Sequence, residues 1–468
     1  MKINGNDLKN IGFPEGRVIG MALDVMQNNY ASMTTAEQLA FLKDLLKDPA
    51  SFADNKMLSP MVEELMRPVD SEIQLKGESQ PYEVYGSEGI EPGAIGQMET
   101  AMKLPITVAG ALMPDAHQGY GLPIGGVLAT KNAVIPYGVG VDIGCRMCLT
   151  LYDIPTTMLE EKKEDLRKML LNNTKFGKAT FKKPKDHEIF ERKEFGEIGI
   201  VREMKDRAWQ QIGSSGGGNH FVEFGIVEVT SDINEYKLPS GRYVALLSHS
   251  GSRGLGANIA GYYTKVAMET CKLPPEARHL AWLDLDREPG QEYWLAMNLA
   301  GDYASACHHQ IHERMAIGLR ETPLAMIENH HNFAWKEKDE EGNEVIVHRK
   351  GATPAGKGVL GIIPGSMATP GFIVRGRGLA ASINSASHGA GRTMSRTRAK
   401  QTILPGQVKK LLKQAGVELI GSGLDEAPMA YKNIHRVMEH QKELVEVLGT
   451  FMPKIVRMCG DEKFQEVD

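Results

Sequence analysis

Short glycine-rich loops that carry a reactive side chain directly after an apolar run constrain this chain more than any other feature. The sequence contains 50 glycines, and many lie in such loops instead of in one repeat. The loop Gly140–Arg146 follows the apolar run Ala133–Tyr137 and places Asp142 three residues before Cys145. Glycine permits tight turns and close approach of the backbone to a ligand. We therefore expect short strands joined by turns that face a bound ligand.

Asp142 and Cys145 begin a candidate metal site. A carboxylate is a hard oxygen ligand and a thiolate can bridge two ions, although a buried cysteine beside a turn aspartate is usually structural. The balance changes downstream, because three histidines each lie in a glycine- or asparagine-rich loop: His220, His249 and His331. Together the five side chains can supply two metals if the thiolate bridges, and they suit Mn²⁺, Zn²⁺, Fe²⁺ or Co²⁺.

A second signal is the segment Ser385–Lys400, in which glycines surround His388. Arg392, Arg396 and Lys400 recur every four residues, which predicts three cations along one helix face. A neutral imidazole beside cations is a competent nucleophile towards a phosphoanhydride, because the cations stabilise the developing charge. An exposed basic helix with an incidental histidine is the alternative. With two metals flanking a nucleotide phosphate, the pattern indicates a metal-dependent phosphoryl or nucleotidyl transferase.

Several other loops allow both a structural and a functional interpretation. The loop around Asp115 and His117 is either a turn or part of a site, and the glycines before His220 form either a hinge or a phosphate-binding nest. If a strand begins near His220, then His220 and Glu223 need not share a face. Arg349 and Lys350 suit a phosphate but also an ordinary basic turn. We interpret three helical histidines as structural or supporting: His308, His309 and His312.

The chain is expected to divide into a helical accessory segment, residues 1–80, and an α+β catalytic module, residues 81–468, with mixed sheets and surrounding helices. A capping box at Thr34 starts a helix, and further helices are predicted over 57–66, 256–320 and 437–447. The net charge of −5 restricts any nucleic-acid site to a local patch. Five cysteines without regular spacing, no apolar run of about 18 residues and no signal peptide predict a cytoplasmic protein outside the membrane.

The motifs resemble those of RtcB-type RNA ligases, in the same order, over roughly residues 81–460. The matching stretches begin at Met113, Gly140, Gly218, Ser248, His348 and Ser387. The resemblance implies a GTP-dependent enzyme with two Mn²⁺ ions. In that family a histidine is guanylylated and GMP passes to an RNA 3′-phosphate, which a 5′-hydroxyl then attacks. A 2′,3′-cyclic phosphate is first opened to the 3′-phosphate. An activating or RNA-repair partner protein is compatible with this assignment.

The resemblance also implies roles for single residues. His388 would be the guanylylated nucleophile, and Cys145 would bridge the two manganese ions. The manganese ligands would be Asp142, Cys145, His220, His249 and His331. Asn219 and Asn332 would contact the GTP phosphates, Glu223 and Tyr431 the guanine, and Ser366 and Arg392 the nucleotide nearby.

Some positions depart from the family pattern. Arg146 stands where the family commonly has glycine, Thr369-Pro370-Gly371 follows the Ile-Pro-Gly-Ser-Met motif, and Arg457–Gly460 replaces a closing Lys-Gly. These departures predict altered nucleotide selectivity with retained chemistry, in a divergent subgroup that repairs cleaved ribosomal or transfer RNA. Two alternatives remain: a metal-dependent phosphodiesterase or nucleotidase that does not need His388, and a non-catalytic RNA-binding protein.

Overall fold

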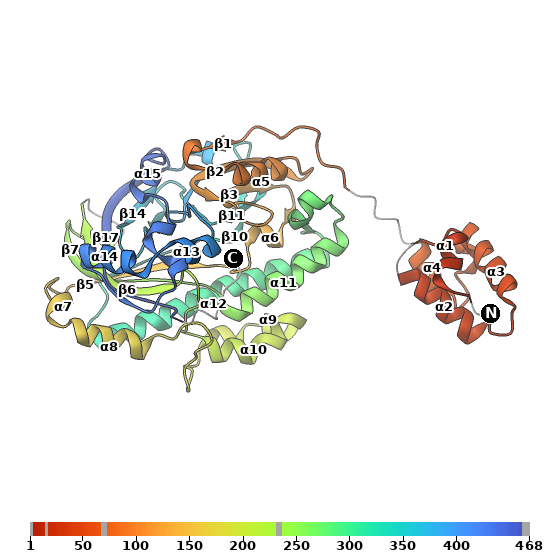
Figure 1. Cartoon of the computed structure of the whole chain (residues 1–468), viewed down its shortest axis with the longest axis horizontal. Coiled ribbons are helices and arrows are strands. Elements are labelled where there is room, and N and C mark those ends of the chain that lie inside the picture. The colour runs from red at the N-terminus through yellow and green to blue at the C-terminus, as the bar shows by residue number, and fades with distance from the viewer. Residues whose placement is uncertain (1–2, 15–16, 67–72, 231–235, 461–468) are drawn as a thin grey trace. The chain divides into compact units, whose positions relative to one another are not determined.

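The computed structural model describes residues 3–14, 17–66, 73–230 and 236–460, and the chain forms two compact units that divide after residue 72 (Figure 1). The first unit is helical: α1 (Gly5–Asn10), α2 (Arg17–Asn29), α3 (Thr35–Lys47), the 3₁₀ turn η1 (Pro49–Phe52) and α4 (Ser59–Met66). The predicted capping box is present, since the backbone N–H of Thr34 donates to Glu37 at 2.7 Å. Its own apolar core includes Leu8, Met26 and Leu42.

The second unit mixes strands and helices. Its strands are β1 (Glu83–Val84), β2 (Thr107–His117), β3 (Ile124–Thr130), β4 (Ala133–Val134), β5 (Arg146–Tyr152), β6 (Phe221–Val229), β7 (Gly241–Ser250), β8 (Leu283–Asp284), β9 (Ala325–His330), β10 (Phe333–Lys338), β11 (Glu344–Lys350), β12 (Ala352–Pro354), β13 (Leu360–Ile363), β14 (Gly371–Gly376), β15 (Ser385–Ser387), β16 (Glu418–Ile420) and β17 (Val445–Met458). Its α-helices are α5 (Pro92–Met102), α6 (Pro136–Val139), α7 (Met158–Glu161), α8 (Lys163–Asn173), α9 (Glu194–Glu197), α10 (Gly199–Gln211), α11 (Arg253–Thr270), α12 (Glu288–Leu319), α13 (Arg396–Thr402), α14 (Pro405–Ala415) and α15 (Ile434–Glu439). Short 3₁₀ turns are η2 (Ser87–Gly89), η3 (Glu188–Glu191), η5 (Pro275–Leu280), η6 (Ala380–Ser382), η7 (Leu424–Glu426) and η8 (Pro428–Ala430).

Within the described residues the largest sheet has the strand order β13-β14-β17-β6-β7-β5-β9, and β16 pairs in parallel with β17. The other neighbours in this sheet are antiparallel. The two end strands approach each other, because the side-chain amide of Asn329 on β9 donates to the carbonyl of Ile362 on β13 at 3.1 Å and accepts from its N–H at 2.8 Å. Apolar side chains from strands all around the sheet share one core, among them Leu149, Leu247 and Phe451. The sheet is therefore strongly curved around that core.

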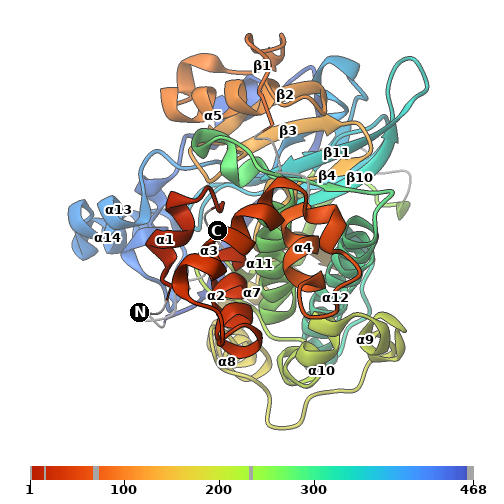
Figure 2. The ribbon, with the colours of Figure 1, turned by 90° about the vertical axis from the view of Figure 1, so that its right-hand side faces the viewer.

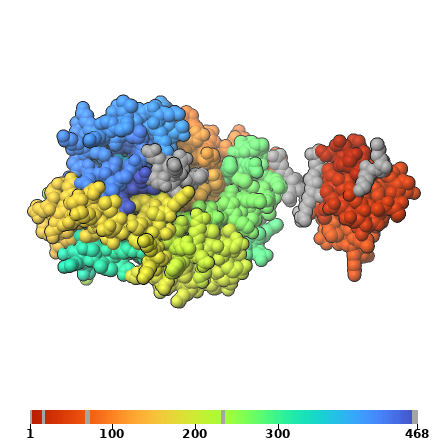
Figure 3. Space-filling view, turned by 60° about the horizontal axis from the view of Figure 1, so that its bottom comes forward, coloured from red at the N-terminus to blue at the C-terminus, as the bar shows by residue number. Residues whose placement is uncertain are grey.

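Helices cover the outer face of this sheet. Phe224 and Leu246 pack there with Ile311 of α12 and Leu170 of α8. The long helices α11 and α12 lie side by side, and α5 covers β2 and β3 of the second sheet, whose order is β1-β2-β3-β11-β10 (Figures 1 and 2). Figure 3 shows α8 in yellow and α10 in yellow-green on the surface of this unit. The large sheet thus packs against helices α8 and α12 on its outer face.

The predicted mixed α+β fold is confirmed, as are long helices over most of 256–320. The helix predicted over 437–447 is wrong. Helix α15 ends at Glu439, and Val445 begins the fourteen-residue strand β17, which lies between β14 and β6. Pro453 is tolerated in this strand because it lies at an irregularity in the pairing with β6, where its missing N–H costs no ladder hydrogen bond. No helix in the described part of the chain is both long and apolar enough to cross a bilayer.

Candidate active site

Strand register collects the predicted metal ligands at one end of the large sheet. Because β5 is antiparallel to β7 and β9, its first residues lie beside the last residues of those strands: Met147 pairs with His249, and Arg146 with His330. Cys145 therefore lies just before β5 and beside His331, which follows β9. In the same way β6 is antiparallel to β7, and His220 precedes its first residue, Phe221, which pairs with His249. Loops that are distant in sequence thus meet by pairing alone.

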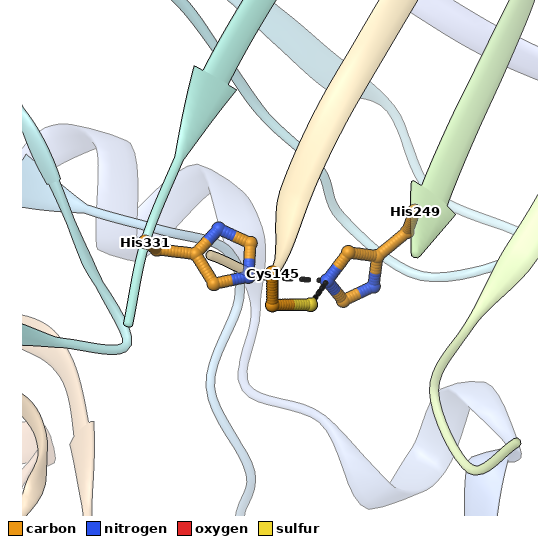
Figure 4. A group of neighbouring side chains, drawn as sticks. All are labelled: Cys145, His249 and His331. Atoms are coloured by element: carbon orange, nitrogen blue, oxygen red, sulfur yellow. Dashed lines mark hydrogen bonds between the residues drawn. The ribbon is translucent and has the colours of Figure 1, made fainter. Parts of the chain in front are cut away.

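Cys145 stands between two groups of candidate ligand atoms. Its sulfur lies 3.2 Å from Nε2 of His249, which is 3.1 Å from Nε2 of His331 (Figure 4). The same sulfur lies 3.4 Å from Nε2 of His220, and that nitrogen is 3.1 Å from Oδ2 of Asp142. The two donor groups, Cys145-His249-His331 and Asp142-Cys145-His220, share only the cysteine. This arrangement suits two cations with a bridging thiolate.

The chemistry of these donors fits metal ions. The Nδ1–H of His249 donates to the carbonyl of Asn219 at 3.2 Å, so its Nε2 keeps a lone pair that points at the cluster. Burial is the main cause that lowers the pKa of His249 to about 3 and the pKa of His331 well below its usual value. Both rings are therefore neutral, which is the form that binds metal. Oδ2 of Asp142 is buried and lies 3.1 Å from Nε2 of His220, and a cation bound to both atoms would satisfy them.

The loop after β7 holds Asp142 in place. Oδ1 of Asp142 accepts the backbone N–H of Ser252 at 3.0 Å, and a Cβ at Gly251 would lie 2.0 Å from both carboxylate oxygens of Asp142. Only glycine fits there. Burial alone would raise the pKa of Asp142, but the contacts of His220, Cys145 and the N–H of Ser252 together outweigh burial and lower it, so the carboxylate is ionised.

His388 lies at the same site, after β15, with its ring centre 4.9 Å from that of His331. Oδ2 of Asp115 accepts the Nδ1–H of His388 at 2.7 Å, the backbone N–H of His388 at 3.1 Å and that of Gly389 at 3.3 Å. Burial opposes the ionisation of Asp115, but the contacts of His388 and the charge of Lys432 lower its pKa overall. With a carboxylate on Nδ1, Nε2 of His388 carries the lone pair, and the side chain is 15% exposed.

One pocket of about 1270 Å³, which includes space open to solvent, is lined by all twelve predicted site residues. Asn332 lines this pocket and has a positive φ of 70°. Oδ1 of Asn332 accepts the N–H of Gly351 at 2.8 Å, and its backbone carbonyl accepts the N–H of Gly144 at 2.9 Å. Ser366 lines the wall, and its backbone N–H donates to Thr369 at 2.7 Å, so the departing Thr-Pro-Gly stretch stabilises this turn.

The pocket lining also combines apolar side chains with buried acids. Glu223 lies among Phe451, Val456 and Met458, and burial raises its pKa well above the usual value. Beside it Tyr431 donates to Glu426, which also forms ion pairs with Arg392 and Arg396. Arg392 precedes α13, so the prediction of one helix face for the three cations is wrong. Arg392, Arg396 and Lys400 converge instead on Glu426 and Asp425.

The positions that depart from the motif pattern have structural partners. Arg146 lies on the opposite face of β5 from the metal-type ligands, where it pairs with Glu328 at 2.8 Å and donates to the carbonyl of Gly301 at 2.9 Å. Arg457 donates to the carbonyl of Leu170 and lies over Phe176, so it faces α8, whereas Met458 lines the pocket. Arg349 is fully buried in a bidentate pair with Glu337, and its interpretation as a phosphate ligand or an exposed turn is wrong.

Behind β7 a buried hydrogen-bond network joins His308 and His312 of α12, in agreement with their interpretation as structural or supporting residues. His308 donates through Nε2 to the carbonyl of Ser250 at 3.1 Å and accepts from the hydroxyl of Ser248 at 2.6 Å. Ser248 accepts from Nε2 of His312 at 2.8 Å, and Nδ1 of His312 accepts from Thr150 at 2.6 Å. Every ring nitrogen is satisfied with both rings neutral. Because Ser248 and Ser250 flank His249, this network fixes the strand that carries a candidate ligand.

Two features were not resolved by sequence reasoning. The sequence allowed both a turn and a site at Asp115, and only the packing of β2, which carries Asp115, against β15 brings it to His388, 273 residues away. The sequence did not require His220 and Glu223 to share a face of a strand, yet both line the pocket. The reason is that His220 lies before β6 begins and is not constrained by the alternation along the strand. The motif Met-Pro-Asp-Ala-His was the available signal for Asp115.

Comparison with known proteins decides the family. The family model for the tRNA-splicing ligase RtcB matches residues 97–199 and 177–458. The chain belongs to the RtcB family. The resemblance inferred from the motifs is therefore confirmed, and the chain is an enzyme of an RNA-ligase family.

Relatives in the RtcB family cover most of this chain. The RNA-splicing ligase RtcB of Escherichia coli strain K12 is 35% identical over 397 residues, which span 77% of this chain and 93% of the relative. The tRNA-splicing ligase RtcB of Aeropyrum pernix is 32% identical and spans 70% of this chain and 83% of the relative. The buried cysteine–histidine cluster fits a metal-dependent RtcB ligase. Residues 1–72 lie outside the ranges matched by the family model.

Proposed function

We propose that this RtcB-family chain is a GTP- and Mn²⁺-dependent RNA ligase that acts through a guanylylated His388. Its substrates would be RNA ends with a 3′-phosphate or a 2′,3′-cyclic phosphate, joined to 5′-hydroxyl ends. The names of the relatives in Escherichia coli and Aeropyrum pernix support RNA splicing as one setting, and RNA repair would require the same joining reaction.

The observation that carries this proposal is the state of His388. Asp115 orients its ring through Nδ1, which leaves Nε2 as a nucleophile beside the metal-type donor cluster. Such an arrangement, in which a nucleophile is oriented and electrostatically supported by an adjacent acid, is a hallmark of covalent catalysis. Neither an incidental histidine nor a simple hydrolase requires it.

The proposed reaction has three group transfers. Nε2 of His388 bonds to the α-phosphorus of GTP, and the bond to pyrophosphate breaks. The GMP group then passes to an RNA 3′-phosphate, which restores the free histidine. Finally a 5′-hydroxyl attacks the phosphorus of the activated RNA 3′-phosphate. The hydroxyl loses its proton, and GMP leaves as the new phosphodiester forms. Asp115 stabilises the imidazolium that the first step creates, because its carboxylate lies on the opposite ring nitrogen.

The other residues would bind and orient the reactants. Asp142, Cys145, His220, His249 and His331 would hold two Mn²⁺ ions, with Cys145 shared between them. When bound, these ions would supply electrostatic stabilisation to phosphate oxygens. Asn219 and Asn332 would contact the triphosphate, and Ser366 and Arg392 the nucleotide. Their positions around a single pocket support these assignments.

Glu223 and Tyr431 would bind the base. An ionised carboxylate accepts hydrogen bonds from guanine, whereas a protonated one can donate to an acceptor nitrogen such as that of adenine. The apolar surroundings of Glu223 support the proposal that nucleotide selectivity is altered in this chain. The closing segment contributes Met458 to the pocket, and in the described structure no lysine of that segment lies there.

The test is covalent labelling. The full chain is incubated with Mn²⁺ and GTP labelled at the α-phosphate, denatured and separated on a gel. Wild type is expected to carry an acid-labile label, and His388→Ala is expected to carry none. Absence of label from both GTP and ATP, with metal occupancy verified, would refute the proposal. A phosphodiesterase would instead keep its hydrolytic activity in His388→Ala.

We further propose that catalysis resides in residues 81–468, that residues 1–80 are accessory, and that the enzyme works in the reducing cytoplasm. All five cysteines lie in the part of the chain that the structure describes, where they are buried and form no disulfide, which supports a reducing compartment. The helical unit of residues 1–72 has its own core, which supports a separate role.

A further inference from the structure

Three rings meet on the surface beside the pocket, and the proposed function gives them no role. Tyr120 lies between β2 and β3, Tyr137 in α6 and His279 in η5. The rings of Tyr137 and His279 are stacked, with centres 5.2 Å apart and planes at 29°. The ring of Tyr120 stands against both, at 6.2 Å and 6.1 Å. Since Tyr120 is 55% exposed, the cluster offers an open aromatic surface instead of a buried core.

The backbone conformation at Gly121 brings these rings together. Gly121 has a positive φ of 68°, and a Cβ there would lie 2.9 Å from the carbonyl oxygen of His279. Any other residue would push the loop that carries Tyr120 away from η5. The contact is therefore built into the sequence at Gly121.

Two cations accompany the rings. Nζ of Lys350 lies 5.0 Å from the ring centre of Tyr137 and donates to the backbone carbonyls of Tyr120 at 2.6 Å and Tyr137 at 3.2 Å. Burial, followed by the charges of Arg278 and Lys350, lowers the pKa of His279. Both cations thus act on the ring of His279, which is neutral near pH 7 and keeps an uncharged stacking face.

The cluster adjoins the nucleophile. Lys350 and His117 line the pocket together with His388. The residue after Lys350 is Gly351, where a Cβ would lie 3.2 Å from Cε1 of His388. His117 is three residues before Tyr120 and contacts the carbonyl of Asp115, which orients His388. A polymer whose reactive end lies at His388 would therefore pass close to the rings.

We propose that Tyr120, Tyr137 and His279 form a stacking platform for an unpaired base of the RNA substrate, with the exposed Arg278 supplying positive charge to its phosphates and the buried Lys350 holding the loops that carry Tyr120 and Tyr137. Aromatic faces with adjacent cations bind single-stranded nucleic acid without selecting a sequence, because every base has a π face. In a chain of net charge −5 such a site must be local, as this one is. The inference rests on the proposed function for the identity of the substrate.

The test measures RNA affinity and nucleophile labelling separately in the full chain. Fluorescence anisotropy with a single-stranded RNA that ends in a 3′-phosphate gives the Kd, and labelling from GTP without RNA reports on folding and on His388. Tyr120→Ala is expected to raise the Kd about fivefold or more, while Tyr120→Phe stays within about twofold of wild type. The labelling rate is expected to change by less than about twofold in either variant.

Two further variants sharpen the result. Trp209→Ala removes an exposed ring on α10, outside the pocket lining, and should leave the Kd unchanged. Arg278→Gln should lower the salt dependence of binding by about one ion, because it removes one phosphate partner. The effect of Tyr120→Ala should disappear with a blunt duplex, in which no base is free to stack.

An unchanged Kd in Tyr120→Ala, or an equal loss for single strand and duplex, would overturn the platform. A rise in the KM for GTP without a change in RNA affinity would overturn it too, since the rings would then serve the nucleotide. Failure of wild type to label would instead count against the proposed function, and the two failures are distinguishable because binding is measured without GTP.

Discussion

Replacing Asp115 by asparagine tests how His388 is activated. Oδ2 of Asp115 accepts three N–H groups, two of them from the backbone at His388 and Gly389. Those backbone donors require an acceptor, so the asparagine oxygen is expected to take the same place and keep the ring oriented. The amide NH₂ then falls where Oδ1 lies buried, with no hydrogen-bond partner among the described residues. The substitution therefore removes the negative charge with little change of geometry.

The expected loss follows from that charge. A charge-assisted hydrogen bond contributes about 1.5 kcal/mol or more, and two opposite charges about 4 Å apart interact by about 4 kcal/mol at an effective dielectric of about 20. Loss of about 1.5 to 4 kcal/mol of support for the imidazolium slows labelling of His388 about 10- to 1,000-fold. Asp115→Ala would instead leave three buried N–H groups without an acceptor, at about 1–3 kcal/mol each, and is expected to impair folding.

The assay is single-turnover labelling from GTP at saturating Mn²⁺, with Asp153→Asn as the control because Asp153 is exposed. Thermal unfolding of Asp115→Asn should stay near that of wild type, so that a slower rate reflects chemistry. Labelling of Asp115→Asn at the wild-type rate would refute the reasoning.

Three further predictions concern the metals, acid stability and the N-terminal unit. Cys145→Ala removes the donor that both groups share, so metal analysis should find less than about half the wild-type content and no labelling, whereas Cys271→Ala, buried outside the pocket, should retain both. Burial lowers the pKa of His312 to about 3 in the folded state, whereas its unfolded value is about 6.5. Between these two pH values the unfolded state binds more protons than the folded state. The free energy of unfolding therefore decreases as the pH falls through this range. His312→Gln should reduce that slope by up to about 1.4 kcal/mol per pH unit without changing it above pH 7, as measured by urea unfolding followed through the four tryptophans, all of which lie in the second unit. Removal of residues 1–72 should leave labelling from GTP within about twofold of the full chain, because those residues lie outside the family match, and a larger loss would contradict an accessory role.

Much of the site could be predicted because its chemistry lies in short motifs after strands. Asp142, Cys145 and His388 stand out through their residue types and the glycines around them, and strand pairing then brings them together. What the sequence could not show is which motifs meet, since Asp115 reaches His388 only because β2 packs against β15, two strands far apart in the chain. It also could not show that Arg349, in a motif suited to phosphate, is buried and forms an ion pair with Glu337.

The errors in secondary structure have a similar origin. The helix predicted over 437–447 is present only up to Glu439, and Val445 and Val447 belong to a strand whose stability comes from pairing on both sides with β14 and β6. Arg392 fits a helical repeat with Arg396, yet the helix begins only where Ser395 accepts the N–H of Arg398 as its N-terminal cap. Strand pairing, which a local pattern does not contain, decided the first case, and the cap at Ser395 decided the second.

The most direct test of the central claim follows the phosphate at the RNA junction. An RNA with a ³²P-labelled 3′-phosphate and a partner with a 5′-hydroxyl are incubated with the full chain, GTP and Mn²⁺, and the product is treated with phosphatase. Wild type is expected to form a joined RNA in which the labelled phosphate is internal and resists phosphatase, and His388→Ala is expected to form none. Joined product from His388→Ala, or release of the label as inorganic phosphate by wild type, would contradict the proposed function.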